Sequence, residues 1–231
     1  KLNNVRIITN TTLFAYMHYN YLLAIQDLQP NKGIDKSNSI RQVIWKIRAK
    51  KVILATGSIE RPLTFNNNDR PGIMLANSVS KYLNGYGINL GKKIIIFTNN
   101  DSAYQTAIDF HYHNINVVAV VDVRNNLKGE LPLKVNNLGI KIYTDSIILN
   151  TSGRKKIKTV HIKKINQKNI EILNCDLLCM SGGWSPTVHL FTQSRGKLRF
   201  REEDSCFIPH LTFQDTLSIG SCNGVFDLKN I

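Results

Sequence analysis

The sequence predicts a mixed α/β protein in which one domain interrupts another. Its middle contains a β-α-β pattern: the apolar run "KKIIIF" at 92–97, a polar turn with a helical segment, and a second apolar run, "VVAVVDV", at 117–123. Strand-like segments precede this pattern, and a short strand, "LSIG" at 217–220, comes near the end. This order indicates a nested two-domain, FAD/NAD(P)-binding Rossmann-like fold whose outer domain is incomplete.

The expected domain boundaries follow from the order of these elements. Alternation of apolar and polar residues before residue 50 indicates strands, and "KVILATG" at 51–57 is apolar enough to be buried on both faces. The segment 75–87 predicts a helix with one apolar face that ends at glycine. We therefore expect an outer dinucleotide-binding domain at 1–88 and 184–231, and an inserted second Rossmann-like domain at 89–183.

The net charge of +14 raises the question of an acidic partner such as nucleic acid. The basic residues are scattered, however, and short clusters such as "GRKKIK" at 153–158 usually lie on solvated surfaces. No apolar run approaches the roughly 20 residues that a membrane-spanning helix needs. We therefore expect neither a nucleic-acid partner nor a membrane partner.

The four cysteines, Cys175, Cys179, Cys206 and Cys222, contain no C-x-x-C pair. Zinc sites and dithiol redox sites need closely paired thiols, so this spacing indicates buried free thiols and a cytoplasmic protein. The histidines show no metal-ligand spacing, and no nucleophile lies in a recognisable arrangement with a base. We expect no metal site and no catalytic residue in this chain.

Two segments are candidates for cofactor binding in the outer domain. The strand "VILATGS" leads three small residues, Ala55, Thr56 and Gly57, into a turn where a bulky cofactor can approach the backbone. Later in the chain, Gly220 closes a strand and Asn223 lies in the expected start of a helix, where N–H groups can bind phosphate. We predict that these five residues bind the cofactor.

The inserted domain has the order of a nucleotide site without its usual glycines. Its turn, "TNNDSAYQTA" at 98–107, has Asn99 and Asn100 where glycines would expose backbone N–H groups to a pyrophosphate. Asp122 follows the second strand, where a working site has the acid that binds the ribose. Because the asparagine side chains would crowd a pyrophosphate, we expect this domain to keep the fold and to bind no nucleotide.

Several segments resemble the α subunits of heterotetrameric sarcosine oxidases. The most specific are "ATGSIERP", "NDRPG", "TNNDSAY" and "SGGWSP", and the similarity continues through "VVAVVDVR" and "IGSCNGVFDL". The resemblance covers nearly the whole chain. A more distant similarity links it to pyridine nucleotide–disulfide reductase-like families. The resemblance implies that this chain is an internal fragment, without the opening glycine-rich β-α-β element and without the folate-binding region.

The resemblance also implies an activity, cofactors and partners. Enzymes of this family oxidise sarcosine to glycine, reduce O2 to hydrogen peroxide and pass the one-carbon unit to tetrahydrofolate. The α subunit carries NAD, the β subunit carries FAD, and FMN lies near their contact, with γ and δ subunits completing the assembly. We expect a cofactor-binding part of an oxidoreductase subunit that acts on CH–NH donors and is inactive as a fragment.

Two alternatives remain open from the sequence. The first is the large subunit of an FAD/NAD-dependent amine, proline or opine dehydrogenase, which shares the outer-domain pattern but normally lacks the "TNNDSAY" and "SGGWSP" contexts. The second is a basic nucleic-acid-binding or scaffold protein, whose binding to random DNA would depend strongly on salt.

Overall fold

The computed structural model describes residues 3–29 and 40–226. The chain divides into two compact units. The outer unit consists of Lys1–Ile59 and Ser185–Ile231, and the inserted unit of Glu60–Trp184. Residues 60–88, which we expected in the outer domain, belong to the inserted unit, because a strand and a helix from this stretch complete its sheet and its helical layer.

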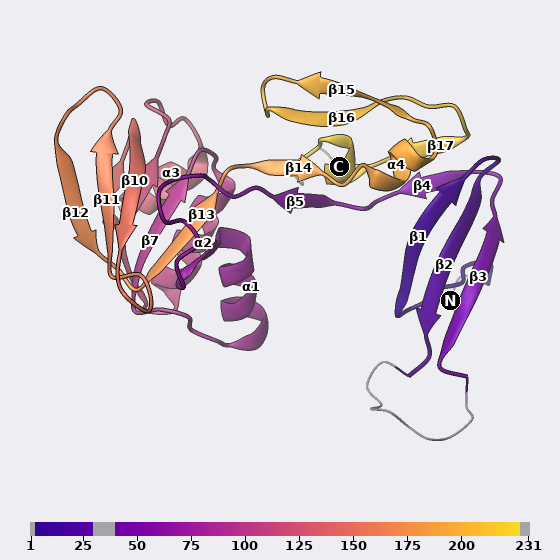
Figure 1. Ribbon diagram of the computed structural model, residues 1–231, viewed down its shortest axis with the longest axis horizontal. Helices are drawn as coiled ribbons and strands as arrows, with labels where there is room; N and C mark the ends of the chain where they lie inside the picture. Colours follow the sequence, from indigo (N-terminus) through magenta and orange to yellow (C-terminus); the bar gives the residue numbers. More distant parts are fainter. Residues whose placement is uncertain (1–2, 30–39, 227–231) are drawn as a thin grey trace. The chain divides into compact units, whose positions relative to one another are not determined.

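The inserted unit is built on a five-stranded parallel sheet in the order β6-β13-β7-β8-β9 (Figure 1). The central strand β7 is buried on both faces from Ile94 to Thr98, as its continuous apolar run predicts. The predicted β-α-β unit is present as β7, α2 and β8. The strands span Ile73–Leu75 (β6), Leu177–Ser181 (β13), Lys93–Thr98 (β7), Asn116–Asp122 (β8) and Ile142–Tyr143 (β9).

Helices cover one face of this sheet and an antiparallel meander covers the other (Figure 1). Helices α1 (Ala76–Tyr86), α2 (Ser102–Tyr112) and α3 (Glu130–Asn137) bury their apolar sides on the first face. The meander consists of β10 (Ser146–Ser152), β11 (Thr159–Lys164) and β12 (Ile170–Asn174). The sheet is therefore enclosed on both faces, and its carboxyl edge is the place where ligands usually bind in such folds.

The outer unit begins with an antiparallel sheet of β1 (Thr11–Met17), β2 (Tyr21–Asp27) and β3 (Gln42–Arg48). Strand β4 (Val52–Leu54) pairs in parallel with β17 (Thr216–Ser218), although the two are far apart in the sequence. A hairpin of β15 (Lys197–Arg201) and β16 (Cys206–Leu211) and the short helix α4 (His189–Gln193) complete the unit. The buried side chains include Tyr16, Leu22, Val52, Leu54, Phe191 and Cys222.

The chain passes between the units at β5 (Ser58–Glu60) and β14 (Trp184–Pro186), which pair as a two-stranded ribbon. The helix expected after Gly220 is a short 3-10 turn, η1, at Gly220–Asn223 within the described part of the chain, and residues 227–231 lie outside it. The polar segment at 30–39 also lies outside the described residues. Across the described ranges, no helix is long and apolar enough to cross a membrane.

Candidate functional site

The structure brings the two predicted segments of the outer unit together. Val52 is opposite Thr216 and Leu54 is opposite Ser218 in the parallel ladder, so β4 and β17 end at the same edge. The Ile219 N–H donates to the Leu54 carbonyl at 3.0 Å, which fixes η1 beside the end of β4. Residues 55–57 and 220–223 therefore form two adjacent turns at the carboxyl ends of parallel strands.

The backbone of these turns is open and needs glycine at two positions. Gly57 has a φ of +75° and Gly220 a φ of +64°, a conformation that side chains rarely adopt. A Cβ placed on Gly57 would meet only the Ser221 Oγ, at 4.0 Å, so space surrounds this backbone. Ala55, Thr56 and Asn223 are exposed. An accessible backbone at this edge fits the close approach of a dinucleotide.

Two hydrogen bonds hold the first of these turns in place. The Thr56 Oγ1 donates to the Thr187 carbonyl at 2.7 Å, and the Thr187 N–H donates to the Gly57 carbonyl at 2.9 Å. Residue 187 thus holds the turn at 55–57 in place, and the turn remains accessible to solvent. The arrangement can position a cofactor.

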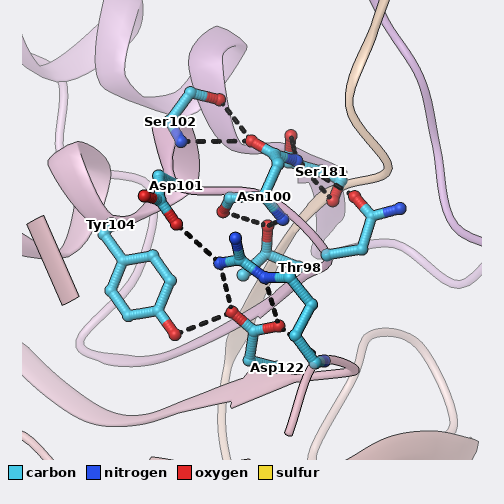
Figure 2. Close-up of polar contacts among 9 residues, drawn as sticks. Thr98, Asn100, Asp101, Ser102, Tyr104, Asp122 and Ser181 are labelled. Atoms are coloured by element: carbon cyan, nitrogen blue, oxygen red, sulfur yellow. Dashed lines mark hydrogen bonds and ion pairs between the residues drawn. The ribbon is translucent and has the colours of Figure 1, made fainter. Parts of the chain in front are cut away.

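The corresponding loop of the inserted unit is closed by its own side chains. The Asn100 N–H donates to the Thr98 Oγ1 at 3.0 Å, and the Ser102 N–H donates to the Asn100 Oδ1 at 3.1 Å (Figure 2). The Asn99 N–H donates to the Ser181 carbonyl at 3.4 Å. A dinucleotide pyrophosphate needs such N–H groups as donors, and here they already have acceptors within the protein.

The side chain of Asn100 connects this loop to the neighbouring strand. Its Nδ2 donates to the Ser181 Oγ at 3.0 Å and to the Ser181 carbonyl at 3.2 Å (Figure 2). Its Oδ1 also accepts from the Ser102 Oγ at 2.6 Å, and the Trp184 indole donates to that same Oγ at 2.9 Å. The asparagine therefore fills the place that a glycine would leave open for a phosphate.

Asp122, the residue in the position of a ribose-binding acid, is fully buried and already bound. Its Oδ2 accepts from the Tyr104 hydroxyl at 2.8 Å (Figure 2) and from the Arg124 Nη2 at 2.8 Å. Its Oδ1 accepts from the Arg124 Nε at 3.1 Å and from the Arg124 backbone N–H at 2.9 Å. Both carboxylate oxygens are occupied, so ribose hydroxyls would have to displace an ion pair.

Asp101 extends this ion pair toward the loop. The Arg124 Nη2 lies 2.7 Å from the Asp101 Oδ1, so one guanidinium joins two carboxylates. Burial lowers the pKa of Arg124, but its hydrogen bonds to Asp122 and Asp101 outweigh that effect and the pKa is raised. Burial and the Asp122 carboxylate raise the pKa of the Tyr104 phenol, so this hydroxyl stays a donor at neutral pH. The inserted crevice thus does not fit a dinucleotide.

Sequence reasoning missed Arg124 and Ser181, which close the inserted crevice. The Asp-x-Arg pattern at 122–124 is the only sequence signal for the ion pair, and it does not reveal the bidentate contact. Ser181 ends β13, and only the sheet order places it beside β7. Within residues 3–29 and 40–226, no group of three potential metal ligands comes together.

No protein-family model matches the chain. Sarcosine oxidase subunit alpha of Corynebacterium sp. (strain U-96) is 37% identical to it over 224 residues, which is 94% of this chain. The chain is homologous to part of sarcosine oxidase subunit alpha. It spans 23% of the length of that relative. The resemblance predicted from "TNNDSAY" and "SGGWSP" is thereby confirmed.

Solved structures support the fold of this alpha-subunit homologue. The T. acidophilum thioredoxin reductase matches 94% of this chain and 67% of its own, with a TM-score of 0.67 and 13% identity. The L-proline dehydrogenase from P. horikoshii matches 92% of this chain and 36% of its own, with a TM-score of 0.58 and 21% identity. At these identities the likeness shows the fold alone, and it confirms the predicted Rossmann-like α/β class.

Proposed function

We propose that this chain is the cofactor-binding part of the alpha subunit of a sarcosine oxidase. The homology over 94% of the chain is the observation that supports this assignment most strongly. The complete enzyme would oxidise sarcosine to glycine with O2 and tetrahydrofolate, giving hydrogen peroxide and methylene-tetrahydrofolate. Since the redox chemistry of such enzymes is carried by their cofactors, the role that we propose for this chain is to hold a cofactor and to assemble with other subunits.

The proposed cofactor site is the pair of turns in the outer unit. Gly57 and Gly220 supply backbone in a left-handed conformation, and Ala55, Thr56 and Asn223 lie exposed beside it. When bound there, NAD or a flavin would supply the redox chemistry. The residues of this chain would contribute position and an uncovered backbone, while further segments of the polypeptide would complete the site.

The inserted unit is proposed to be structural. Its loop N–H groups and the Asp122 carboxylate are bound within the protein, which leaves few donors and acceptors for a dinucleotide. NAD, FAD, FMN and tetrahydrofolate are accordingly not assigned to the inserted unit. The proposed partners are the β, γ and δ subunits of a hetero-oligomer. The four cysteines are buried thiols that form no disulfide, which agrees with a reducing cytoplasm.

A second candidate function is the large subunit of a proline or related amine dehydrogenase. The structural likeness to the P. horikoshii L-proline dehydrogenase favours it, although the identity of 21% is lower than that to the sarcosine oxidase subunit. Oxidation of sarcosine and of L-proline by the complete complex distinguishes the two. Sarcosine-dependent hydrogen peroxide formation supports the first assignment, and proline-dependent reduction of an artificial electron acceptor supports the second.

The location of the cofactor can be tested with two isosteric substitutions. Asn223→Asp adds a negative charge beside the outer turns, and Asn99→Asp adds the same charge to the inserted loop. If NAD binds the outer unit, calorimetric titration of the complete polypeptide should show at least tenfold weaker binding for Asn223→Asp, about 1.4 kcal/mol. Asn99→Asp should leave the affinity unchanged, and the reverse result would assign the cofactor to the inserted unit.

A further inference from the structure

The outer unit contains a cleft of about 630 Å³ at the end opposite its proposed cofactor site. Four segments meet there, at 18–20, 49–50, 194–195 and 213–215. Lys50 lies just before β4 and Asp215 just before β17, so the cleft lies at the amino ends of the strands whose carboxyl ends form the proposed cofactor turns. Its volume falls within the ~300–1,000 Å³ range of small-molecule sites.

A hydrogen-bond network centred on Asn20 connects the segments that line this cleft. The Asn20 backbone N–H donates to the Gln214 Oε1 at 2.7 Å, and the Asn20 Nδ2 donates to the carbonyls of Lys50 and Asp215, each at 3.1 Å. The Tyr16 hydroxyl donates to the Asn20 Oδ1 at 2.7 Å. Asn20 is only 5% exposed, so its side chain ties the segments together. Hydrogen bonds between segments that are distant in the sequence therefore maintain the cleft.

Tyr19 and Arg195, which line the cleft, have left-handed backbone conformations that usually favour glycine or asparagine. Tyr19 and Asn20 have φ values of +56° and +50°, as in a type I′ hairpin turn, where asparagine and glycine are preferred. Arg195 has a φ of +68°. A left-handed conformation costs a side chain about 1–2 kcal/mol. Tyrosine and arginine at such positions are strained, and strain of this kind clusters at functional sites.

The side chains that line the cleft combine aromatic and basic groups. Tyr19 is 83% exposed and Phe213 is 62% exposed, although both are aromatic. Lys50 and Arg195 supply two positive charges to the lining, and His18 adds an imidazole. The carboxylate of Asp215 lies 3.5 Å from the ammonium of Lys51, outside the lining, which offsets its charge. Such a lining suits a planar ring that carries negative charge.

We propose that this cleft binds a small anion composed of a planar ring and a phosphate or carboxylate group. The anionic group is attracted by Lys50 and Arg195, and the ring packs against the aromatic side chains of Tyr19 and Phe213. The site is separate from the proposed cofactor turns and does not depend on the oxidoreductase assignment. The strain at Tyr19 and Arg195 is explained because each presents a ligand-binding group that asparagine or glycine would lack.

Phenyl phosphate is a direct probe, with phenol and inorganic phosphate as its component controls. Calorimetric titration of the complete polypeptide should show saturable binding of phenyl phosphate that is tighter than that of either component and weakens as salt increases. Tyr19→Asn and Arg195→Gly should each weaken binding at least tenfold. Both replacements favour the left-handed backbone, so the thermal unfolding midpoint should stay the same or rise.

Matched substitutions elsewhere separate this site from general surface effects. Tyr86→Asn and Lys81→Gln change exposed side chains of α1, and both should leave phenyl phosphate binding unchanged, whereas Lys50→Gln should weaken it. Asn223→Asp should also leave it unchanged, which distinguishes the cleft from the proposed cofactor site. Absence of saturable binding to the wild type would overturn the proposal, and so would wild-type affinity in both Tyr19→Asn and Arg195→Gly. The proposal would also be overturned if Tyr19→Asn no longer bound a partner subunit but kept its affinity for phenyl phosphate. The cleft would then be a protein-docking surface.

Discussion

Arg124 forms a bidentate ion pair with the buried carboxylate of Asp122, with Nε 3.1 Å from Oδ1 and Nη2 2.8 Å from Oδ2. The pair occupies the crevice that a dinucleotide ribose would need, and it connects to the loop through Asp101. The Arg124 guanidinium thus binds the aspartate that, in dinucleotide-binding Rossmann folds, binds the ribose hydroxyls. This contact is expected to contribute to the stability of the inserted unit, and it supports the expectation that this unit binds no nucleotide.

Removing the guanidinium should destabilise the inserted unit. In Arg124→Ala, the Asp122 carboxylate, which is fully buried in the wild type, keeps only the Tyr104 hydroxyl and the backbone N–H of residue 124 as protein donors. We expect a loss of about 2–4 kcal/mol in the free energy of unfolding, measured by urea denaturation. Lys141→Ala, which removes an exposed ion pair with Glu171, should cost no more than about 0.5 kcal/mol. Equal effects of the two substitutions would contradict the role of the buried pair.

Two glycine-to-alanine substitutions in the inserted unit should have opposite signs. A Cβ on Gly129 would clash with the Asp101 Oδ2, so the carboxylate that contacts Arg124 through its Oδ1 would have to shift. Gly129→Ala should therefore lower the free energy of unfolding by about 1 kcal/mol. A Cβ on Gly85, in helix α1, would meet nothing within 4 Å, so Gly85→Ala should raise it by about 0.5–1 kcal/mol. Chemical denaturation of both variants checks the contrast.

Glu60 should make the protein less stable as pH rises. Its side chain is 6% exposed, and burial raises the pKa of its carboxyl above 4.5, although the Asn77 N–H donates to it at 2.9 Å. As the pH rises through 4.5, the Glu60 carboxyl loses its proton in the unfolded chain but keeps it in the folded chain. The free energy of unfolding therefore falls with rising pH until the pH exceeds the pKa of the folded state.

Glu60→Gln isolates this effect, because the amide oxygen can still accept from the Asn77 N–H. The free energy of unfolding of the variant, minus that of the wild type, should increase as the pH is raised from 4.5 to 7. Urea titrations at several pH values give this difference. A constant difference over that range would show that burial does not disfavour the charged carboxylate.

The buried cysteines should react slowly with alkylating reagents. Burial raises the pKa of the Cys175 thiol to about 12, so at pH 8 roughly one thiol in 10⁴ is ionised in the folded state. Iodoacetamide should modify Cys175 and Cys179 only after unfolding in urea, as measured by mass spectrometry. Rapid modification of the native protein would show that the strand β13 region opens readily.

Local patterns in the sequence predicted the elements of the inserted unit well. The continuous apolar runs correspond to β7 and β8, and the helix that was predicted to end at glycine is α1, which is followed by Gly87 at a φ of +64°. The patterns did not indicate that 60–88 belongs to the inserted unit. That depends on β6 pairing with β13, a contact between residues about a hundred positions apart.

The sequence by itself determined the fold class, the absence of glycines from the inserted loop and the two small-residue turns of the outer unit. These features depend on periodicity and on residue size, which are local properties. Only the tertiary structure decided which groups donate hydrogen bonds to the Asp122 carboxylate and which N–H groups of the inserted loop already have acceptors. It also decided that one cleft is lined by Tyr19, Lys50, Arg195 and Phe213. The physical reason is that hydrogen-bond partners and burial depend on segments distant in the chain, which no local pattern records.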